Sequence, residues 1–151
     1  MKIEDVITGA GVICYFDNRN NLIKDLDQEI LYLVLQDFRN KYDFTKGTKD
    51  KGEEVLECAI RETYEESNLD SFNFEKIYNP IIANNNLVMF MGQIKYETMI
   101  QRNDIIKLKI NKQINSPEHK SYKFLSYKNI LKVDLYEYLL PYLESAQNIL
   151  Y

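Results

Sequence analysis

Three glutamates lie at helical spacing near the middle of the chain. Glu62, Glu65 and Glu66 occupy positions i, i+3 and i+4, so on an α-helix, which turns about 100° per residue, they share one face. Carboxylates at this spacing repel one another, and a helix selected only for stability would mix in lysines. Oxygen ligands that converge in this way suit Mg2+ or Mn2+, which bind phosphate-bearing substrates. The spacing therefore predicts metal-dependent phosphoryl or pyrophosphoryl transfer.

The loop before these glutamates carries both glycines and lysines. Lys46, Lys49 and Lys51 can neutralise phosphate charge, and Gly47 and Gly52 allow the backbone to approach a ligand or metal closely. Any one of these residues is most simply a member of a surface loop. The set predicts a substrate-binding loop that leads into the acidic helix.

The fixed positions together form the pattern G-x5-E-x7-R-E-x2-E-E. From residue frequencies, this pattern is expected by chance in on the order of one such chain in 10^5. The segment from Gly47 to Leu69 resembles the Nudix box, the signature of hydrolases that cleave nucleoside diphosphates linked to another moiety. The resemblance implies an α/β class fold, the Nudix α/β/α sandwich with a mixed central sheet.

The resemblance also implies a role for each motif residue. The implied metal ligands, for Mg2+ or Mn2+, are the carbonyl of Gly47 and the carboxylates of Glu62, Glu65 and Glu66. Arg61, with Glu53, orients the helix and its glutamates. Either Glu62 or Glu65 acts as the base that activates water, and the sequence leaves that choice open.

Three positions depart from the usual Nudix pattern. Thr45 replaces a frequent proline, Thr63 replaces an aliphatic residue, and Asn68 replaces a glycine near the helix end. Asparagine is, after glycine, the residue that best accepts a left-handed helix cap. We therefore expect Asn68 to end the helix, and Thr63 to pack its methyl group, without loss of a metal ligand.

A second segment, 116–125, bears on the substrate. It resembles the Glu-His-x-x-Tyr segment of diadenosine polyphosphate hydrolases, which implies that Glu118 approaches the metal as a ligand or base and that Tyr122 stacks on a nucleobase. The residues alone also allow an exposed loop carboxylate and a core tyrosine. His119, the single histidine, is expected to have a structural hydrogen-bonding role. Two further tyrosines are candidates for stacking, Tyr42 and Tyr78.

We therefore expect a hydrolase of dinucleoside polyphosphates such as diadenosine tetraphosphate. The alternatives within the family are ADP-ribose, nucleoside triphosphates, capped RNA and inositol pyrophosphates. A non-catalytic nucleotide-binding module is a further alternative, although that function predicts lost glutamates and all are present.

Strands and helices must hold these residues in place, and hydropathy predicts both. From Glu53 to Asn68 the pattern has period 3.6, with Leu56, Ala59, Ile60 and Thr63 on the packing face. Helical spacing recurs from Asp134, as N-cap, to Leu150, with Pro141 bending the helix. The segment 105–110 is ambiguous. The predicted strands are Val6–Phe16, Ile30–Leu35, Phe74–Ile82, Leu87–Tyr96 and Ser121–Leu125, with turns at Asp17–Asn21 and Asn84–Asn86.

Composition limits the remaining possibilities. The 151 residues are 45% hydrophobic and 28% charged, with net charge −4, which predicts a single domain over residues 1–151 and disfavours long nucleic acids as partners. Apolar runs are too short to span a membrane. With Cys14 and Cys58 as core residues and an acidic N-terminus, we expect a cytoplasmic protein with a small-molecule partner. The choice between monomer and homodimer stays open.

Overall fold

The computed structural model describes residues 6–78, 80–84, 86–108, 110–111 and 116–151. Among these residues, eight strands form one sheet whose central order is β10-β2-β1-β7-β5. The strand β1 pairs in parallel with β7 and antiparallel with β2, so the sheet is mixed as predicted. The short strands β3, β4 and β6 pair with β2, β1 and β7, respectively. The strands are β1 (Gly9–Asp17), β2 (Ile30–Asp37), β3 (Tyr42–Asp43), β4 (Thr45–Thr48), β5 (Phe74–Ile77), β6 (Ile81–Ile82), β7 (Leu87–Ile94), β10 (His119–Ser126) and a separate pair, β8 (Ile110–Asn111) with β9 (Ser116–Pro117).

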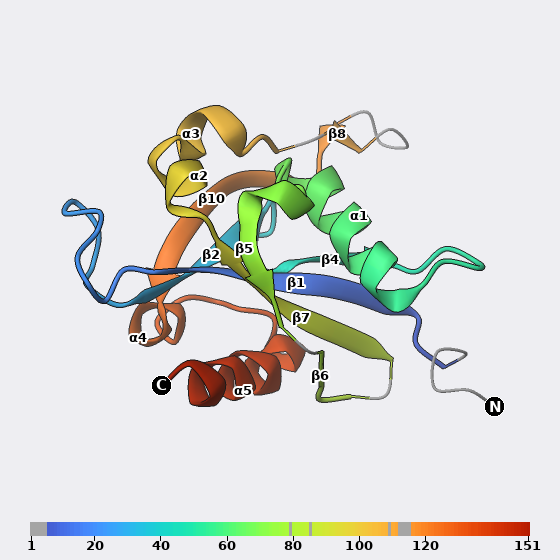
Figure 1. The fold of residues 1–151 in the computed structure, drawn as a ribbon. Coiled ribbons are helices and arrows are strands. Elements are labelled where there is room, and N and C mark those ends of the chain that lie inside the picture. The colour runs from blue at the N-terminus through green and yellow to red at the C-terminus, as the bar shows by residue number, and fades with distance from the viewer. Residues whose placement is uncertain (1–5, 79, 85, 109, 112–115) are drawn as a thin grey trace.

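Helices lie on both sides of this sheet. Figure 1 shows α1 on one side and α5 on the other, with α2 and α3 at the end of the sheet where β10 curves upward. The helices are α1 (Val55–Ser67), α2 (Tyr96–Ile100), α3 (Arg102–Ile105), α4 (Tyr127–Ile130) and α5 (Leu140–Leu150), with 3-10 turns at Ser71–Asn73 and Glu137–Leu139.

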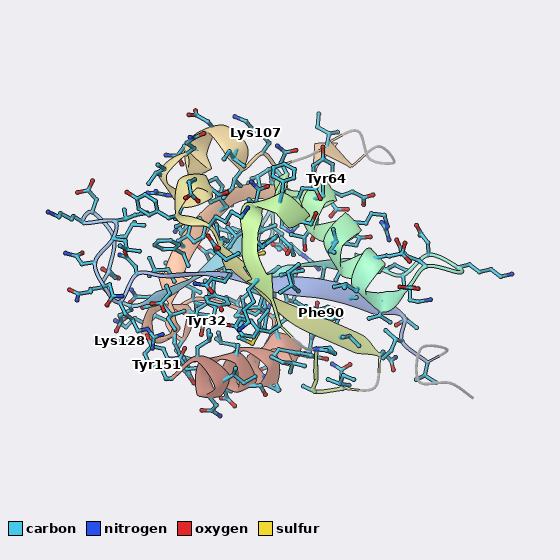
Figure 2. All side chains as sticks on the ribbon, in the orientation of Figure 1. Tyr32, Tyr64, Phe90, Lys107, Lys128 and Tyr151 are labelled. Carbon is cyan, nitrogen blue, oxygen red and sulfur yellow. The ribbon has the colours of Figure 1, made fainter. Side chains whose placement is uncertain are left out.

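The alternation of side chains along β1 produces the two layers of core. Val12 and Cys14 pack in the cluster beneath α1, whereas Ile13 and Tyr15 pack in the cluster with α5. Successive residues of a strand face opposite sides, so an apolar strand must be covered twice. Tyr32 of β2, labelled in Figure 2, packs in the cluster with α5, and its hydroxyl donates a hydrogen bond to Gln147 over 2.6 Å. The α/β/α sandwich is confirmed.

Local residues set both ends of α1. The backbone N–H of Glu54 donates to the Glu57 carboxylate over 3.1 Å, which satisfies a donor at the first turn. At the other end Asn68 has φ 70°, and its N–H donates to the Tyr64 carbonyl over 2.8 Å. The predicted helix and its left-handed asparagine cap are therefore confirmed.

The predicted packing face of α1 was partly wrong. Leu56 is 41% exposed and Ile60 only half-buried, because the helix approaches the sheet through the small residues Cys58 and Ala59. Leu56 instead lines an apolar cavity of about 240 Å³ with Val88 and Phe90 of β7 and Ile82 of β6. The prediction that Cys58, Cys14, Ala59 and Thr63 are core residues is confirmed.

The C-terminal helix starts later than predicted. Pro141 lies in the first turn of α5 and does not bend its interior, because a residue without an N–H fits where no intrahelical donor is needed. Asp134 is not an N-cap, and its carbonyl accepts a hydrogen bond from the Tyr42 N–H over 2.8 Å.

Two strand boundaries also differ. The predicted strand Phe74–Ile82 is divided into β5 and β6, both antiparallel to β7, because Pro80 between them has no N–H for the ladder. Tyr96 begins α2 rather than ending β7. Of the ambiguous segment, Ile105 ends α3 and Ile110 begins β8. Residues 1–5, and Asn85 of the predicted turn, lie outside the described residues. Within the described ranges, no helix is long and apolar enough to cross a membrane.

Candidate active site

Arg61 joins the loop before α1 to the acidic face of that helix. Its Nε and Nη2 donate to the two carboxylate oxygens of Glu53, over 2.7 and 3.0 Å. Its Nη1 donates to Glu62 over 2.9 Å and to Glu65 over 3.2 Å, and Nη2 also donates to the Thr48 carbonyl over 2.9 Å. These hydrogen bonds from Arg61 lower the pKa of Glu53 to about 2. We call this set of contacts the Arg61 clamp.

Glu62 lies directly against the backbone of Gly47. A Cβ atom placed on Gly47 would lie 2.1 Å from the Glu62 carboxyl carbon, so only glycine leaves room for that carboxylate. The Glu62 side chain is 15% exposed, and burial raises its pKa in spite of the adjacent Arg61 charge. The Gly47 carbonyl lies 3.7 Å from the Cys58 thiol, which donates to it.

Glu66 is the most enclosed of the three helix glutamates. Its Oε1 accepts a hydrogen bond from the Lys46 backbone N–H over 2.7 Å, and its side chain is 11% exposed. Burial raises the pKa of Glu66 well above its ordinary value, although that hydrogen bond opposes the change. Glu66 therefore connects the end of α1 to β4.

Glu118 and His119 come from a different part of the chain and meet Glu66. His119 begins β10, which pairs with β2 beside β1. One potential ligand atom from each of Glu66, Glu118 and His119 lies within 4.8 Å of the others. Glu66 and His119 are buried and Glu118 is exposed. Burial lowers the pKa of His119, which favours its neutral form.

Lys46 also contacts a buried carboxylate that sequence reasoning passed over. Its Nζ donates to Oδ2 of Asp43 over 3.0 Å and lies 5.5 Å from the ring centroid of Tyr138. The other Asp43 oxygen is buried without a hydrogen bond in the described structure. Burial lowers the pKa of Lys46, but the charge of Asp43 and the hydrogen bonds with Asp43 and Tyr138 together raise it above its ordinary value. Lys46 thus presents a fixed, charged ammonium beside Glu66.

The other predicted site residues are less closely grouped. The Glu65 side chain is 53% exposed and points toward Arg61. Lys49 is half-buried and Lys51 exposed, and among the described residues neither forms an ion pair. The structure thus brings Glu66 and Glu118 together but holds Glu62 and Glu65 on Arg61.

The predicted stacking tyrosines differ in their surroundings. Tyr122 packs edge-on against Phe124 and its hydroxyl donates to Asn103. Tyr42 is buried in the cluster that contacts α5, with its hydroxyl accepting from Lys123 over 3.1 Å. Tyr78 stacks on Tyr15 with ring centroids 6.2 Å apart. Tyr42 is therefore a core residue and a poor stacking candidate.

The donor set fits a divalent cation. Glu66 keeps Oε2 available because Lys46 occupies Oε1, and Glu118 adds a second carboxylate within ligand distance of the same point. Carboxylates of this kind bind Mg2+ or Mn2+, which also retain waters and bind substrate phosphates. The ammonium of Lys46 is paired with Asp43 over 3.0 Å.

Comparison with solved structures agrees with this architecture. The crystal structure of C. elegans Ap4A hydrolase matches with a TM-score of 0.64 and 20% identity, over 97% of this chain and 99% of that one. The chain has the Nudix fold. The NUDIX domain of Shewanella oneidensis NrtR, complexed with ADP ribose, matches the Nudix fold of this chain with a TM-score of 0.67 and 13% identity, over 96% and 88% of the two chains. A MutT protein from Methanosarcina mazei matches with a TM-score of 0.56 and 18% identity, over 94% and 93%. No family model and no curated protein sequence matches the chain.

Within this Nudix fold, the sequence analysis missed one site residue, Asp43, and did not place His119 beside Glu66. Asp43 lies on β3 opposite Leu35 of β2, and the one signal for it was an acid inside the buried run Tyr42-Asp43-Phe44, three residues before Lys46. His119 was assigned a hydrogen-bonding role, and its place beside Glu66 depends on the pairing of β10 with β2.

Proposed function

We propose that this chain is a divalent-metal-dependent Nudix hydrolase that cleaves a phosphoanhydride bond in a nucleoside diphosphate derivative. The observation that carries the proposal is the convergence of Glu66, from α1, and Glu118, from the segment before β10, on one point beside Lys46. Carboxylates that meet at one place repel one another, and a bound cation offsets that repulsion. The likeness to Nudix structures supports the same activity.

Each residue has a defined task in this proposal. Glu66 and Glu118, with Glu62, hold Mg2+ or Mn2+, and the bound ion supplies charge neutralisation and an acidified water. The Arg61 clamp holds the acidic face of α1 in place through hydrogen bonds from Arg61 to Glu53, Glu62 and Glu65. The ammonium of Lys46 would neutralise negative charge on a substrate phosphate.

We assign the general base to Glu62 in preference to Glu65. Burial raises the pKa of Glu62, so it has the higher proton affinity that a base needs. Glu62 is also held on two sides, by the Gly47 backbone and by Arg61. Glu65, which is half exposed, instead neutralises Arg61.

For the substrate we propose dinucleoside polyphosphates such as diadenosine tetraphosphate. Support comes from the Glu118-His119-x-x-Tyr122 segment and from the likeness to the crystal structure of C. elegans Ap4A hydrolase. ADP-ribose is the second candidate, because the NrtR domain with the same fold was crystallised with ADP ribose. Net charge −4 favours such small nucleotides over a long RNA.

A substrate panel tests the proposal. Purified protein is incubated with Mg2+ or Mn2+ and diadenosine polyphosphates, ADP-ribose, NADH, deoxynucleoside triphosphates, capped RNA or an inositol pyrophosphate, and products are separated by chromatography. We expect diadenosine tetraphosphate to have the highest kcat/KM, with all turnover stopped by EDTA. ADP-ribose as the best substrate would replace the substrate assignment while leaving the hydrolase proposal in place.

Matched variants link that activity to the site. Glu66→Gln and Glu118→Gln are each expected to lower kcat at least about 100-fold, because a neutral amide is a poor metal ligand. Glu75→Gln, on the exposed side of β5, makes the same charge change away from the site. Tight nucleotide binding without turnover of any compound would instead identify a non-catalytic module.

A further inference from the structure

The His119 imidazole lies within the carboxylate cluster. Its side chain is 7% exposed, and its Nδ1 is 3.9 Å from Oε2 of Glu66. The ligand atoms of Glu66, Glu118 and His119 all lie within 4.8 Å of one another. The cluster therefore contains a nitrogen donor as well as carboxylate oxygens.

The 3.9 Å separation suits an ion between the two groups better than a direct hydrogen bond. An N–H···O hydrogen bond is about 2.7–3.2 Å long. Two ligand atoms that are each about 2.1 Å from one ion lie about 3 Å apart when adjacent and about 4.2 Å apart when opposite. The observed separation falls inside that interval.

Fixed contacts hold two of the three groups in place. The other oxygen of Glu66 accepts the Lys46 N–H over 2.7 Å, which directs Oε2 toward His119. The strand pairing of His119 with Asp37 of β2 fixes its backbone. Glu118, the third member of the set, is exposed to solvent.

We propose that His119 is a metal ligand together with Glu66 and Glu118, and that its imidazole makes this site prefer Mn2+ to Mg2+. Imidazole nitrogen suits first-row transition metals, whereas Mg2+ takes oxygen ligands and retains its waters. The inference rests on the proposed function, because it specifies the metal of that same site. It also changes the role expected for His119 from hydrogen bonding to coordination.

The single histidine allows a test without any substitution. The protein is prepared without a histidine tag, with natural abundance or 15N-labelled histidine, and loaded with one equivalent of Mn2+. Electron spin-echo modulation is expected to show a nitrogen coupled to Mn2+ that changes from 14N to 15N on labelling. Because His119 is the chain's one histidine, that change assigns the ligand. Bound Mn2+ without nitrogen coupling overturns the proposal, because His119 would then not be a ligand.

Metal affinities test the selectivity. Free Mn2+ is followed by electron paramagnetic resonance, and Mg2+ affinity is measured by competition. We expect Mn2+ to bind at least tenfold more tightly than Mg2+, and His119→Gln to reduce that ratio at least fivefold. Lys120→Gln, a neighbouring exposed position on β10, controls for charge and folding, and circular dichroism confirms that His119→Gln is folded. An unchanged ratio in the folded variant overturns the proposal.

These outcomes separate this inference from the proposed function. Nitrogen-coupled Mn2+ in a protein that hydrolyses no compound in the panel supports the ligand assignment and contradicts the hydrolase. Hydrolysis by a protein that binds Mn2+ through oxygen atoms alone supports the hydrolase and contradicts the assignment of His119 as a ligand. Failure of Mn2+ to bind contradicts both.

Discussion

The hydroxyl groups of Thr45 and Thr63 lie 2.9 Å apart in the buried contact between β4 and α1. Thr45 also donates to the Val12 carbonyl over 2.9 Å, so its single proton is used and Thr63 is the donor of the pair. These are two of the positions at which the chain departs from the usual Nudix pattern. The hydroxyl groups at these two positions hydrogen-bond to each other, and this contact fixes α1 against β4, the strand that contains Gly47.

This pairing predicts a coupled effect on stability. Thr63→Val removes the donor and Thr45→Val leaves the Thr63 hydroxyl buried without its partner, so each is expected to lower the free energy of unfolding by about 1–3 kcal/mol. The double variant should cost clearly less than the sum, because no unpaired hydroxyl remains. Urea unfolding measures all three. Thr48→Val, at an exposed position of the same strand, is the control, and strict additivity would contradict the pairing.

The Arg61 clamp predicts a turnover defect for Arg61→Lys. A lysine ammonium cannot make the forked contact with Glu53 and also bridge Glu62 and Glu65. We expect kcat and metal affinity to fall together, by about tenfold or more, with KM nearly unchanged. Arg19→Lys disrupts a similar forked pair, with Asp17, far from the site, and should leave kcat unchanged. If the single defect of Arg61→Lys is a raised KM, Arg61 contacts the substrate and does not orient the glutamates.

The same clamp predicts a pH dependence of stability. The Glu53 pKa is about 2 in the folded chain against an ordinary value of 4.5. A depressed folded-state pKa contributes stability that is present above pH 4.5 and is lost as the pH falls toward about 2. The difference in unfolding free energy between the wild type and Glu53→Gln should therefore be largest near neutrality and shrink across that interval. Glu75→Gln is the reference for a charge change at an exposed position, and a pH-independent difference for Glu53→Gln would exclude the linkage.

The features that the sequence predicted correctly are those that depend on residues close together in the chain. The glutamate spacing, the period of 3.6 residues and the cap at Asn68 each depend on neighbours within a few turns, and the structure has α1 where they placed it. Leu56 was misassigned because its hydropathy favours burial, whereas the sheet accepts the small side chains of Cys58 and Ala59. Periodicity identifies an apolar face but not which side chains let the helix approach.

The parts of the site that could not be predicted depend on strand pairing. Nothing local indicates that His119 reaches Glu66, because this contact requires β10 to pair with β2 and β2 with β1. Asp43 was missed for a different reason: its partner Lys46 is only three residues away, but the sequence does not show that this pair is buried together. The Glu118 position followed from a family resemblance and not from spacing.

Variants of Tyr122 and Glu118 test the substrate class. If Tyr122 stacks on a nucleobase, Tyr122→Leu should remove about 1–3 kcal/mol of transition-state binding for diadenosine tetraphosphate and much less for an inositol pyrophosphate, which has no base. Tyr122→Phe retains the ring and loses the hydrogen bond to Asn103, so it should retain the ratio of the two kcat/KM values. Glu118→Gln should lower kcat/KM for both substrates alike, because a metal ligand acts on the phosphates that they share.

The packing of Tyr122 against Phe124 gives the opposing expectation, that Tyr122 is a core residue. Thermal unfolding separates the two, because a Tyr122→Leu protein that loses stability and keeps its substrate ratio would identify a core residue and remove the support for dinucleoside polyphosphates.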